Sequence, residues 1–240
     1  MKLFIDTANL VDIEAALKRG FARGITTNPS LLAKEPKGNF ADHVGKIIGL
    51  IREYQPGAHL SVEVFSRDAD VIFEQALDFH RRFSYDNLSV KVQIGWDELE
   101  VIRRLKAKDI AVNCTACMSV TQAVMAASAG ARYVSLFWGR IRDGGLSAVR
   151  AGGIDRGVWD DHDFDPAKVV RSARSLIDAS YPGVEIIVGS IRSVVDVRDA
   201  GLSGAHIVTV PPKFFPDMIN HFKTDEIVDQ FLKDFREWLT

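Results

Sequence analysis

Lys91 lies in an apolar run, residues 88–93, where we expect a buried strand and where a charged amine is costly to bury. Side chains alternate along a strand, so Lys91 shares one face with Ser89 and Gln93, while Val90 and Val92 point the other way. Lowering a lysine pKa from about 10.4 to about 7 by burial takes roughly 4 to 5 kcal/mol. The pattern indicates a neutral, nucleophilic amine, although an edge-strand lysine or a structural ion pair with a carboxylate also fits it.

Polar residues also occur at or near the carboxyl ends of other expected strands. They are Asp6, Thr26, Thr27, Asn28, Glu63, Asn113, Thr115, Ser135 and Ser190. Their apolar neighbours, such as Val62 and Val112, alternate to the opposite face, so the polar groups should converge inside the fold. A structural barrel interior is filled mainly with Val, Ile and Leu, so this many polar groups favour an active site over a buried structural network.

These side chains suit carbon–carbon bond chemistry on a sugar fragment. An uncharged amine forms a Schiff base with a ketone, and the Schiff base accepts electrons when an adjacent carbon–carbon bond breaks. Asp6 and Glu63 can transfer protons, while Asn28, Asn113 and Ser135 can hydrogen-bond hydroxyl groups. Arg140, Ser190 and Arg192 follow two late strands, and a helix is expected to begin at 192. They predict a pocket for an anionic tail, unless they are surface arginines beside a helix cap.

Short β-rich runs alternate with amphipathic helical runs along the whole chain. Strands are expected near 2–6, 23–27, 59–65, 87–93, 110–115, 132–138, 184–190 and 205–210, and helices near 10–20, 40–54, 68–83, 96–107, 119–129, 166–180, 192–201, 214–222 and 225–239. About eight βα units favour an α/β fold with one domain over 1–240, a single (β/α)8 TIM barrel with an additional C-terminal helix. A doubly wound open sheet is the alternative, but no glycine-rich phosphate turn follows the first strand. The stretch 139–165 is expected to be a surface loop, acting as a lid.

Composition argues against several classes of partner. The formal net charge of -2 and the pI near 6.3 give no reason to expect nucleic acid or an anionic membrane surface as a partner. We find neither a signal peptide nor a membrane span, and the two cysteines suit a reducing compartment, so we expect a cytoplasmic protein.

We expect no cofactor and no metal. Cys114 and Cys117 have the spacing of a redox or zinc pair, but no second thiol or histidine pair completes a zinc site. Residues 160–163 could bind a divalent metal in a metal-dependent lyase, but a solvated loop before a helix at Pro166, capped by Asp165, fits better. The other histidines show no pattern. A noncatalytic barrel that binds sugar phosphates is the third alternative.

Several of these segments resemble the transaldolase and fructose-6-phosphate aldolase family. The matching segments are 1–9, 24–30, 61–64, 90–92, 113–115, 129–135, 139–140, 190–192 and 209–211. The resemblance implies that Lys91 forms the Schiff base, that Asp6 is the general acid/base at the C4 hydroxyl, and that Glu63 and Thr115 position a catalytic water. It also implies a set of substrate-binding residues: Asn28, Asn113 and Ser135 for the dihydroxyacetone unit, with Thr27 and Phe137 beside them, and Arg140, Ser190 and Arg192 for a terminal phosphate.

The residues at two positions bear on whether the enzyme transfers the dihydroxyacetone unit to an acceptor or only cleaves the donor. In this family, members that only cleave carry Gln and Tyr where transferring members carry Glu and Phe, and this chain has Glu63 and Phe137. We therefore expect a transaldolase of the pentose phosphate pathway type, with a fructose-6-phosphate aldolase-type lyase as the alternative. Departures from the family pattern at Gln93, Ala116-Cys117, Leu136, Trp138 and Arg142 lie near the expected tail site. They leave open a sulfonated donor such as 6-deoxy-6-sulfofructose.

The C-terminal segment has an apolar stripe at helical spacing. It consists of Ile227, Val228, Phe231, Leu232, Phe235, Trp238 and Leu239. Most such stripes pack on their own domain, but a barrel that already has outer helices leaves little room for one more. Because relatives of this short form use the last helix to clasp neighbouring subunits, we expect a homo-oligomer, and the resemblance implies a decamer.

Overall fold

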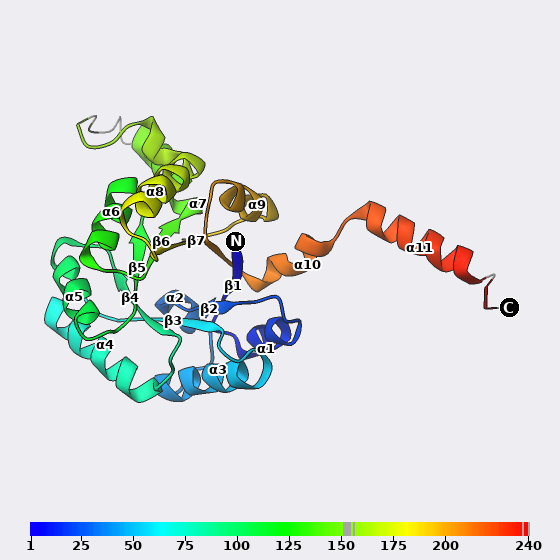
Figure 1. The fold of residues 1–240 in the computed structure, drawn as a ribbon, viewed down its shortest axis with the longest axis horizontal. Coiled ribbons are helices and arrows are strands. Elements are labelled where there is room, and N and C mark those ends of the chain that lie inside the picture. Colours follow the sequence, from blue (N-terminus) through cyan, green and yellow to red (C-terminus); the bar gives the residue numbers. More distant parts are fainter. Residues whose placement is uncertain (151–154, 156, 237, 240) are drawn as a thin grey trace.

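Eight parallel strands close into a barrel in the computed structural model, which describes residues 1–150, 155, 157–236 and 238–239 (Figure 1). The strands are β1 (Lys2–Asp6), β2 (Gly24–Thr26), β3 (His59–Glu63), β4 (Leu88–Gln93), β5 (Val112–Cys117), β6 (Tyr133–Phe137), β7 (Glu185–Gly189) and β8 (Ile207–Val210). Each strand pairs with the next, and β1 pairs with β8, which closes the ring. The predicted (β/α)8 barrel is confirmed, and the open-sheet alternative is wrong.

Helices alternate with the strands along the chain, and most of them lie around the outside of the barrel (Figure 1). They are α1 (Leu10–Lys18), α2 (Pro29–Leu32), α3 (Phe40–Tyr54), α4 (Ala69–Phe83), α5 (Trp96–Lys106), α6 (Val120–Ala129), α7 (Trp138–Arg150), α8 (Pro166–Ser180), α9 (Val194–Leu202), α10 (Phe215–Ile219) and α11 (Phe222–Arg236), with short 3₁₀ turns η1 (Asp161–Phe164) and η2 (Pro212–Phe214). None of the helices in the described part of the chain combines the length and the apolar character that crossing a membrane requires.

The barrel has two separate hydrophobic layers. Outward-facing strand residues such as Ile5, Val62 and Val112 pack against the helices, as the alternation predicted. A second, smaller cluster fills the inside of the barrel at the end where the strands begin, and consists of Phe4, Ile187, Ile207 and the partly buried Tyr133. This inner cluster closes the barrel interior at the end where the strands begin.

A glycine in β2 makes room for the inner cluster. A Cβ atom on Gly24 would lie 2.7 Å from the Phe4 ring and 2.9 Å from the Cβ of His59. Any larger residue at Gly24 would therefore displace the aromatic residues that close the barrel.

Asparagine, aspartate and serine side chains cap most of the barrel helices. Asp165, for example, accepts hydrogen bonds from Ala167 N and Lys168 N, and Pro166 is the first residue of α8, as predicted. Each such cap typically contributes about 1 kcal/mol to stability. The caps fix where each helix leaves its strand and so position the strand ends that carry the polar residues.

The expected loop at 139–165 is wrong over its first part, because α7 begins at Trp138, directly after β6. Glycines disfavour a helix, and Gly144 and Gly145 led us to expect a loop. The Phe164 side chain packs against both, so that a Cβ atom on either would lie 3.1 Å from a Phe164 atom. Packing thus compensates for the low helix propensity. Gly152 and Gly153 lie outside the described residues.

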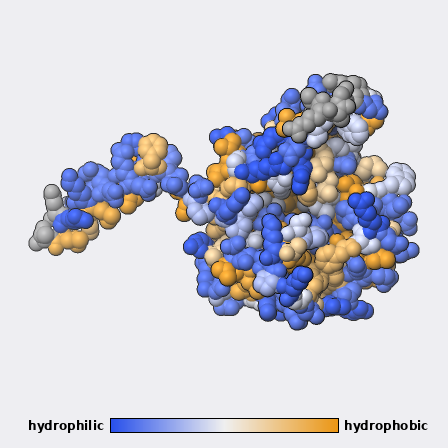
Figure 2. Space-filling view, turned by 180° about the vertical axis from the view of Figure 1, so that it is seen from behind, coloured by the Kyte–Doolittle hydropathy of each residue, from blue (hydrophilic) through white to orange (hydrophobic). Residues whose placement is uncertain are grey.

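The other boundary differences are small, except at the C-terminus. The helix expected from 192 begins at Val194, because the Ser193 side chain accepts a hydrogen bond from Asp196 N and caps it. The helix expected at 225–239 spans 222–236. It projects away from the barrel, and every residue in it is exposed (Figure 1). Figure 2 shows hydrophobic side chains along one side of this projecting helix. Phe231 and Phe235 are among its exposed apolar residues.

Candidate active site

Three charged or polar side chains lie next to one another on adjacent strands inside the barrel. Strand pairing places Glu63 of β3 beside Lys91 of β4, and Lys91 beside Asn113 of β5. Glu63 is the last residue of β3 and Lys91 lies in the second half of β4, toward the carboxyl ends of the strands, where active sites occur in barrels of this type.

The Lys91 side chain lies inside the barrel and is only 4% exposed. Its Nζ donates a hydrogen bond to the Thr27 carbonyl oxygen at 2.9 Å and forms an ion pair with Glu63 Oε2 at 2.9 Å. Burying a charged group is tolerable only when it is paired and hydrogen-bonded, so these two contacts explain how the barrel holds an amine there. An ion pair with a carboxylate was one of the interpretations left open by the sequence, and it is present here.

Asp6 provides a second carboxylate beside the amine. Burial raises the pKa of Asp6, an effect that the neighbouring Glu63 carboxylate reinforces and that Lys91 and a hydrogen bond from Thr26 oppose. Thr26 Oγ1 donates to Asp6 Oδ1 at 2.9 Å, so its contact with Thr209 Oγ1 at 2.6 Å must be donated by Thr209. A carboxyl group with a raised pKa is suited to give and take protons near neutral pH.

Thr115 has an unsatisfied hydroxyl group. Its Oγ1 is buried, and among the described residues it has no hydrogen-bond partner. Leaving a buried hydroxyl without a partner costs about 1 to 3 kcal/mol, so the atom is available for a water molecule or a substrate group. The next residue, Ala116, has a φ of 62°, and the pairing with β6 shifts register between Cys114 and Cys117. Such a bulge is frequent beside active sites.

Asn113 and Ser135 are linked by hydrogen bonds. Ser135 Oγ donates to Asn113 Oδ1 at 2.8 Å, and Asn113 Nδ2 donates to Ser61 Oγ at 3.1 Å. Asn113 is fully buried, and Ser135 is buried on the neighbouring strand β6. One amide hydrogen of Asn113 and the lone pairs of the Ser135 hydroxyl remain for a ligand.

The structure gives Thr27 and Asn28 supporting contacts that the sequence did not reveal. Thr27 Oγ1 donates to the Ser61 carbonyl oxygen at 3.1 Å, while its own carbonyl oxygen accepts from Lys91. Asn28 Oδ1 accepts a hydrogen bond from Leu31 N and so caps α2. Thr27 therefore positions the amine, and the amide nitrogen of Asn28 and the second lone pair of its Oδ1 remain for a ligand.

The predicted anion-binding residues lie where β6 and β7 end. Gly139 N donates to the Ser190 carbonyl oxygen at 3.1 Å, and Ser190 has a φ of 58°. A Cβ atom on Gly139 would lie 2.6 Å from Arg192 Nε, so only glycine lets the Arg192 side chain cross the first turn of α7. Arg140, the next residue of α7, is exposed. The fold thus brings the β6 and β7 ends together at one rim.

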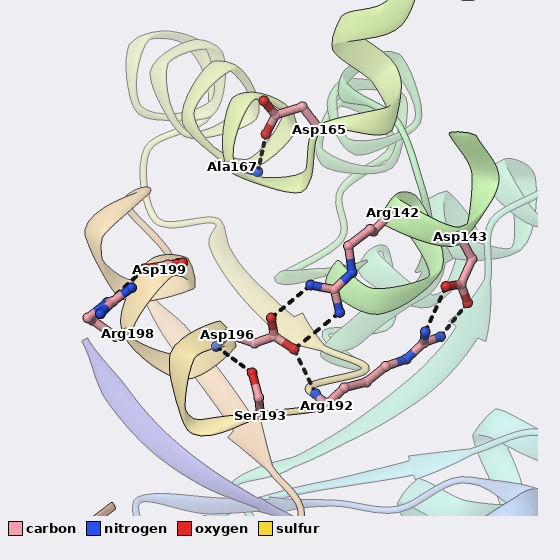
Figure 3. Close-up of polar contacts among 9 residues, drawn as sticks. All are labelled: Arg142, Asp143, Asp165, Ala167, Arg192, Ser193, Asp196, Arg198 and Asp199. Atoms are coloured by element: carbon pink, nitrogen blue, oxygen red, sulfur yellow. Dashed lines mark hydrogen bonds and ion pairs between the residues drawn. The ribbon is translucent and has the colours of Figure 1, made fainter. Parts of the chain in front are cut away.

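Carboxylates that sequence analysis missed are paired with the arginines at this rim (Figure 3). Arg192 Nη1 donates to Asp143 Oδ1 at 2.7 Å, and this contact lowers the pKa of Asp143. Arg142 forms a two-point ion pair with the buried Asp196, at 3.1 and 3.5 Å. Asp196 also accepts a hydrogen bond from the Arg192 backbone N at 2.9 Å, which holds the turn that carries Arg192.

The family departures have different surroundings in the fold. Leu136 and Trp138 are buried in the core between strands and helices, and Trp138 begins α7, directly before Gly139 and Arg140. The Gln93 amide donates to the Ser66 carbonyl oxygen and to Glu98 Oε1, at 2.9 and 3.0 Å. Gln93 and Glu98 line a groove that leads to Glu63.

The alternative motifs have structural explanations. Cys114 and Cys117 are free and buried, and their sulfur atoms are 4.0 Å apart. The contact with Cys114 and burial raise the pKa of Cys117, which disfavours a reactive thiolate. Asp160 caps η1 in a capping box with Asp163. Across the part of the chain that the structure describes, no three His, Cys, Asp or Glu side chains form a group that could hold a metal ion.

Comparisons with known proteins agree with this geometry. The family model described as Transaldolase/Fructose-6-phosphate aldolase matches residues 3–239. A probable transaldolase of Symbiobacterium thermophilum is 35% identical over 235 residues, covering 98% of this chain and 97% of the relative. A probable transaldolase of Parvibaculum lavamentivorans is 34% identical over 239 residues, covering 99% and 97%.

Solved structures show the same fold at low identity. Thiamine phosphate pyrophosphorylase from Pyrococcus furiosus superposes with a TM-score of 0.55 at 16% identity, covering 88% of this chain and 85% of that one. At such low identity the likeness concerns the barrel alone.

Proposed function

Because the chain belongs to the transaldolase/fructose-6-phosphate aldolase family, we propose that it is a Schiff-base-forming transaldolase. It transfers a dihydroxyacetone unit from a ketose with an anionic tail, such as fructose 6-phosphate, to an aldehyde acceptor. The observation that carries the proposal is the buried Lys91 amine, in contact with Glu63 and close to the Asp6 carboxyl group, whose pKa is raised.

The reaction begins at Lys91. Glu63, at 2.9 Å, accepts a proton from the ammonium group, and the free amine then attacks C2 of the ketose. The carbinolamine loses its hydroxyl group as water, and an iminium forms between Nζ and C2. The unpartnered Thr115 hydroxyl and Glu63 hold a water molecule that relays the protons of these steps.

Asp6 acts in the second stage. It takes the proton of the C4 hydroxyl as the C3–C4 bond breaks, and the electron pair of that bond moves into the iminium to give an enamine. The aldehyde product leaves and an acceptor aldehyde enters. The enamine carbon attacks the acceptor carbonyl, and Asp6 returns the proton to the new alkoxide. Water then releases the ketose product from Lys91.

Transfer is favoured over simple cleavage by the side chains around the enamine. Phe137 has no hydroxyl group with which to deliver a proton to the enamine carbon, so the enamine waits for an acceptor. The lyase alternative requires that the enamine be protonated faster than an acceptor arrives.

The tail of the donor binds at the rim formed by Arg140, Ser190 and Arg192. A sulfonated donor is the second candidate, because carboxylates already offset part of the positive charge at this rim. Asp143 pairs with Arg192, and Asp196 pairs with the neighbouring Arg142. A phosphate dianion would experience more repulsion from these carboxylates than a singly charged sulfonate would.

We also propose that the chain forms a homo-oligomer through α11, with the decamer of its short relatives as the expected form. The exposed apolar side of α11 supports this, because large exposed apolar patches usually mark an interface. A cytoplasmic location and a place in the pentose phosphate pathway complete the proposal. We expect the substrate to be a small sugar phosphate or sulfonate rather than a nucleic acid or a membrane.

A kinetic assay with a Lys91→Met variant tests the proposal. Transfer from fructose 6-phosphate to an aldose phosphate should disappear in this variant and persist in Lys108→Met, which removes an exposed lysine instead. Addition of a chelator should leave the wild-type rate unchanged. Loss of activity with chelator and retention in Lys91→Met would support the metal-dependent lyase, and fructose 6-phosphate binding without any turnover would support a noncatalytic barrel.

A further inference from the structure

A buried polar cluster lies beneath the proposed active site, between it and the closed end of the barrel. His59 Nε2 lies 2.7 Å from Ser61 Oγ and 3.0 Å from Ser89 Oγ, and the two hydroxyl oxygens are 2.9 Å apart. Both serines are fully shielded from solvent, and His59 is buried between the rings of Phe4 and Tyr133. The mechanism proposed above uses none of these three polar residues.

The His59 ring is neutral under ordinary conditions. Burial lowers the pKa of His59 to about 3, with smaller contributions from the charges of Lys2 and Arg132. A neutral imidazole has one nitrogen that donates and one that accepts a hydrogen bond, so the role of Nε2 depends on which nitrogen carries the hydrogen.

Counting hydrogens assigns that role. In the structure Asn113 Nδ2 faces Ser61 Oγ, so the Asn113 amide oxygen does not accept a hydrogen bond from this cluster. If Nε2 then carried the hydrogen, it and the two hydroxyl groups would supply three hydrogens, but only the two hydroxyl oxygens could accept. Two hydroxyls cannot donate to each other at once, so one hydrogen would stay unsatisfied at a buried position, at a cost of about 1 to 3 kcal/mol. With Nε2 as the acceptor, both hydroxyl hydrogens find a partner within the cluster. Nε2 of His59 is therefore the acceptor.

The His59 assignment in turn stabilises this orientation of the Asn113 amide. Because Ser61 gives its hydrogen to another member of the cluster, its oxygen can only accept from Asn113, which holds the NH2 group of Asn113 toward Ser61. The amide oxygen then faces Ser135, so the Ser135 hydroxyl donates to it and keeps its lone pairs free. A ligand hydroxyl between Asn113 and Ser135 thus meets one donor and one acceptor in defined places.

We propose that His59 and Ser61 are positioning residues that orient Asn113 and Ser135 to hold the C1 hydroxyl group of the donor ketose. With the C4 hydroxyl assigned to Asp6, the hydroxyl groups of the dihydroxyacetone unit on C1 and C3 remain. We choose C1, because C3 changes from tetrahedral to planar as the C3–C4 bond breaks, whereas a donor and an acceptor in fixed places suit a group that keeps its geometry. This inference rests on the proposed function, since it concerns the same dihydroxyacetone unit.

The test compares fructose 6-phosphate with 1-deoxyfructose 6-phosphate, which lacks only that hydroxyl. The measured quantity is the ratio of kcat/KM for the two donors, a ratio that general loss of stability does not change. In Ser61→Ala the Asn113 amide loses its acceptor, and we expect the ratio to fall roughly ten-fold. The matched control is Ser89→Ala, which removes the same atom from the same cluster without touching Asn113 and should keep the wild-type ratio.

A second pair of variants addresses His59 itself. His59→Phe keeps an aromatic ring but removes the acceptor, so Ser61 can turn its hydrogen toward Asn113, and the ratio should again fall roughly ten-fold. His59→Gln can place an amide oxygen where Nε2 lies and should restore the ratio. The inference is overturned if Ser61→Ala and His59→Phe keep the wild-type ratio, or if all four variants lose it equally.

Failure of the inference can be separated from failure of the proposed function. If wild-type protein transfers from fructose 6-phosphate and needs Lys91, the function stands whatever the variants show. If wild-type protein does not turn over either donor, the proposed function fails, and this inference fails with it.

Discussion

Charges inside the barrel and charges at the rim where β6 and β7 end are held in opposite ways. Inside, Lys91 is buried and the Glu63 side chain is 20% exposed, and the two side chains project from neighbouring strands of a closed sheet. At the rim, Arg192 and Asp143 are both more than a third exposed. Arg192 lies in the turn before α9, and Asp143 lies in α7. Exposed pairs are weak and exchange partners easily, whereas breaking a buried pair costs several kcal/mol. The interior is therefore suited to hold reacting groups in fixed positions, and the rim is suited to exchange one ion-pair partner for another when a ligand binds.

The largest effect should come from removing the interior acid. Asp6→Asn keeps the shape and the contact with Thr26 but cannot accept the C4 proton, so kcat should fall on the order of 10² to 10⁴-fold. Schiff-base formation should survive, which borohydride trapping of the variant would show. A Thr26→Val change, which removes only the hydrogen bond to Asp6, should have a smaller effect. A normal kcat in Asp6→Asn would remove Asp6 from the mechanism.

The buried His59 should make stability depend on pH. Its folded pKa of about 3 lies below the ordinary value of 6.5, so the unfolded chain binds the extra proton as pH falls. The contribution of neutral His59 to the free energy of unfolding is fully present above about pH 6.5. It decreases by about 2 kcal/mol when the pH is lowered to about 5. Asp6, with its raised pKa, acts in the opposite direction. Denaturant unfolding of wild type and His59→Phe isolates the histidine, and an identical pH slope in both proteins would contradict the prediction.

At the rim, loss of one arginine should weaken binding rather than chemistry. We expect Arg192→Ala to raise KM for fructose 6-phosphate about 10 to 100-fold with a much smaller change in kcat. Because the rim is exposed, the effect of the wild-type arginine should decrease with added salt. A fall in kcat as large as the rise in KM would mean that Arg192 affects the chemical step as well as binding, and would contradict this division between rim and interior.

A change beside the enamine should shift the balance between transfer and cleavage. Phe137→Tyr introduces a hydroxyl group that can help protonate the enamine, and we expect cleavage to increase about ten-fold relative to transfer. The measurement is the ratio of free dihydroxyacetone to transferred product at fixed acceptor concentration. Phe137→Leu, which adds no hydroxyl group, serves as the control and should keep the wild-type ratio.

The smallest expected effect is a difference in KM between donors with a phosphate tail and donors with a sulfonate tail. Asp143→Asn removes the carboxylate that pairs with Arg192, which should lower KM several-fold for a phosphate donor and less for a sulfonate donor. Asp178→Asn, a change at another exposed ion pair, is the control and should alter neither value. Equal changes for the two donors would mean that Asp143 does not discriminate between them.

The difference between the barrel interior and the rim also explains which features could be predicted from the sequence. Alternation along a strand is a local rule, and it placed Lys91, Glu63 and Asn113 on the inner face. The carboxylates of Asp143 and Asp196 could not be foreseen, because their arginine partners lie on other elements and no periodicity connects them.

His59 and α7 were missed for related reasons. His59 looked like a scattered histidine. Ser61 lies two residues further along the same strand, but Ser89 comes from β4, and only the register of β3 and β4 brings it into contact. Helix α7 was missed because glycine propensity was weighed without the packing of Phe164 against it.

Borohydride trapping tests the central claim most directly. Wild-type protein is incubated with fructose 6-phosphate, reduced and mapped by peptide mass spectrometry, with Lys91→Met treated in parallel. We predict a dihydroxyacetone adduct on the peptide that contains Lys91 and no adduct in the variant. Turnover of the ketose without any adduct on Lys91, or an adduct on a different lysine, would contradict the account.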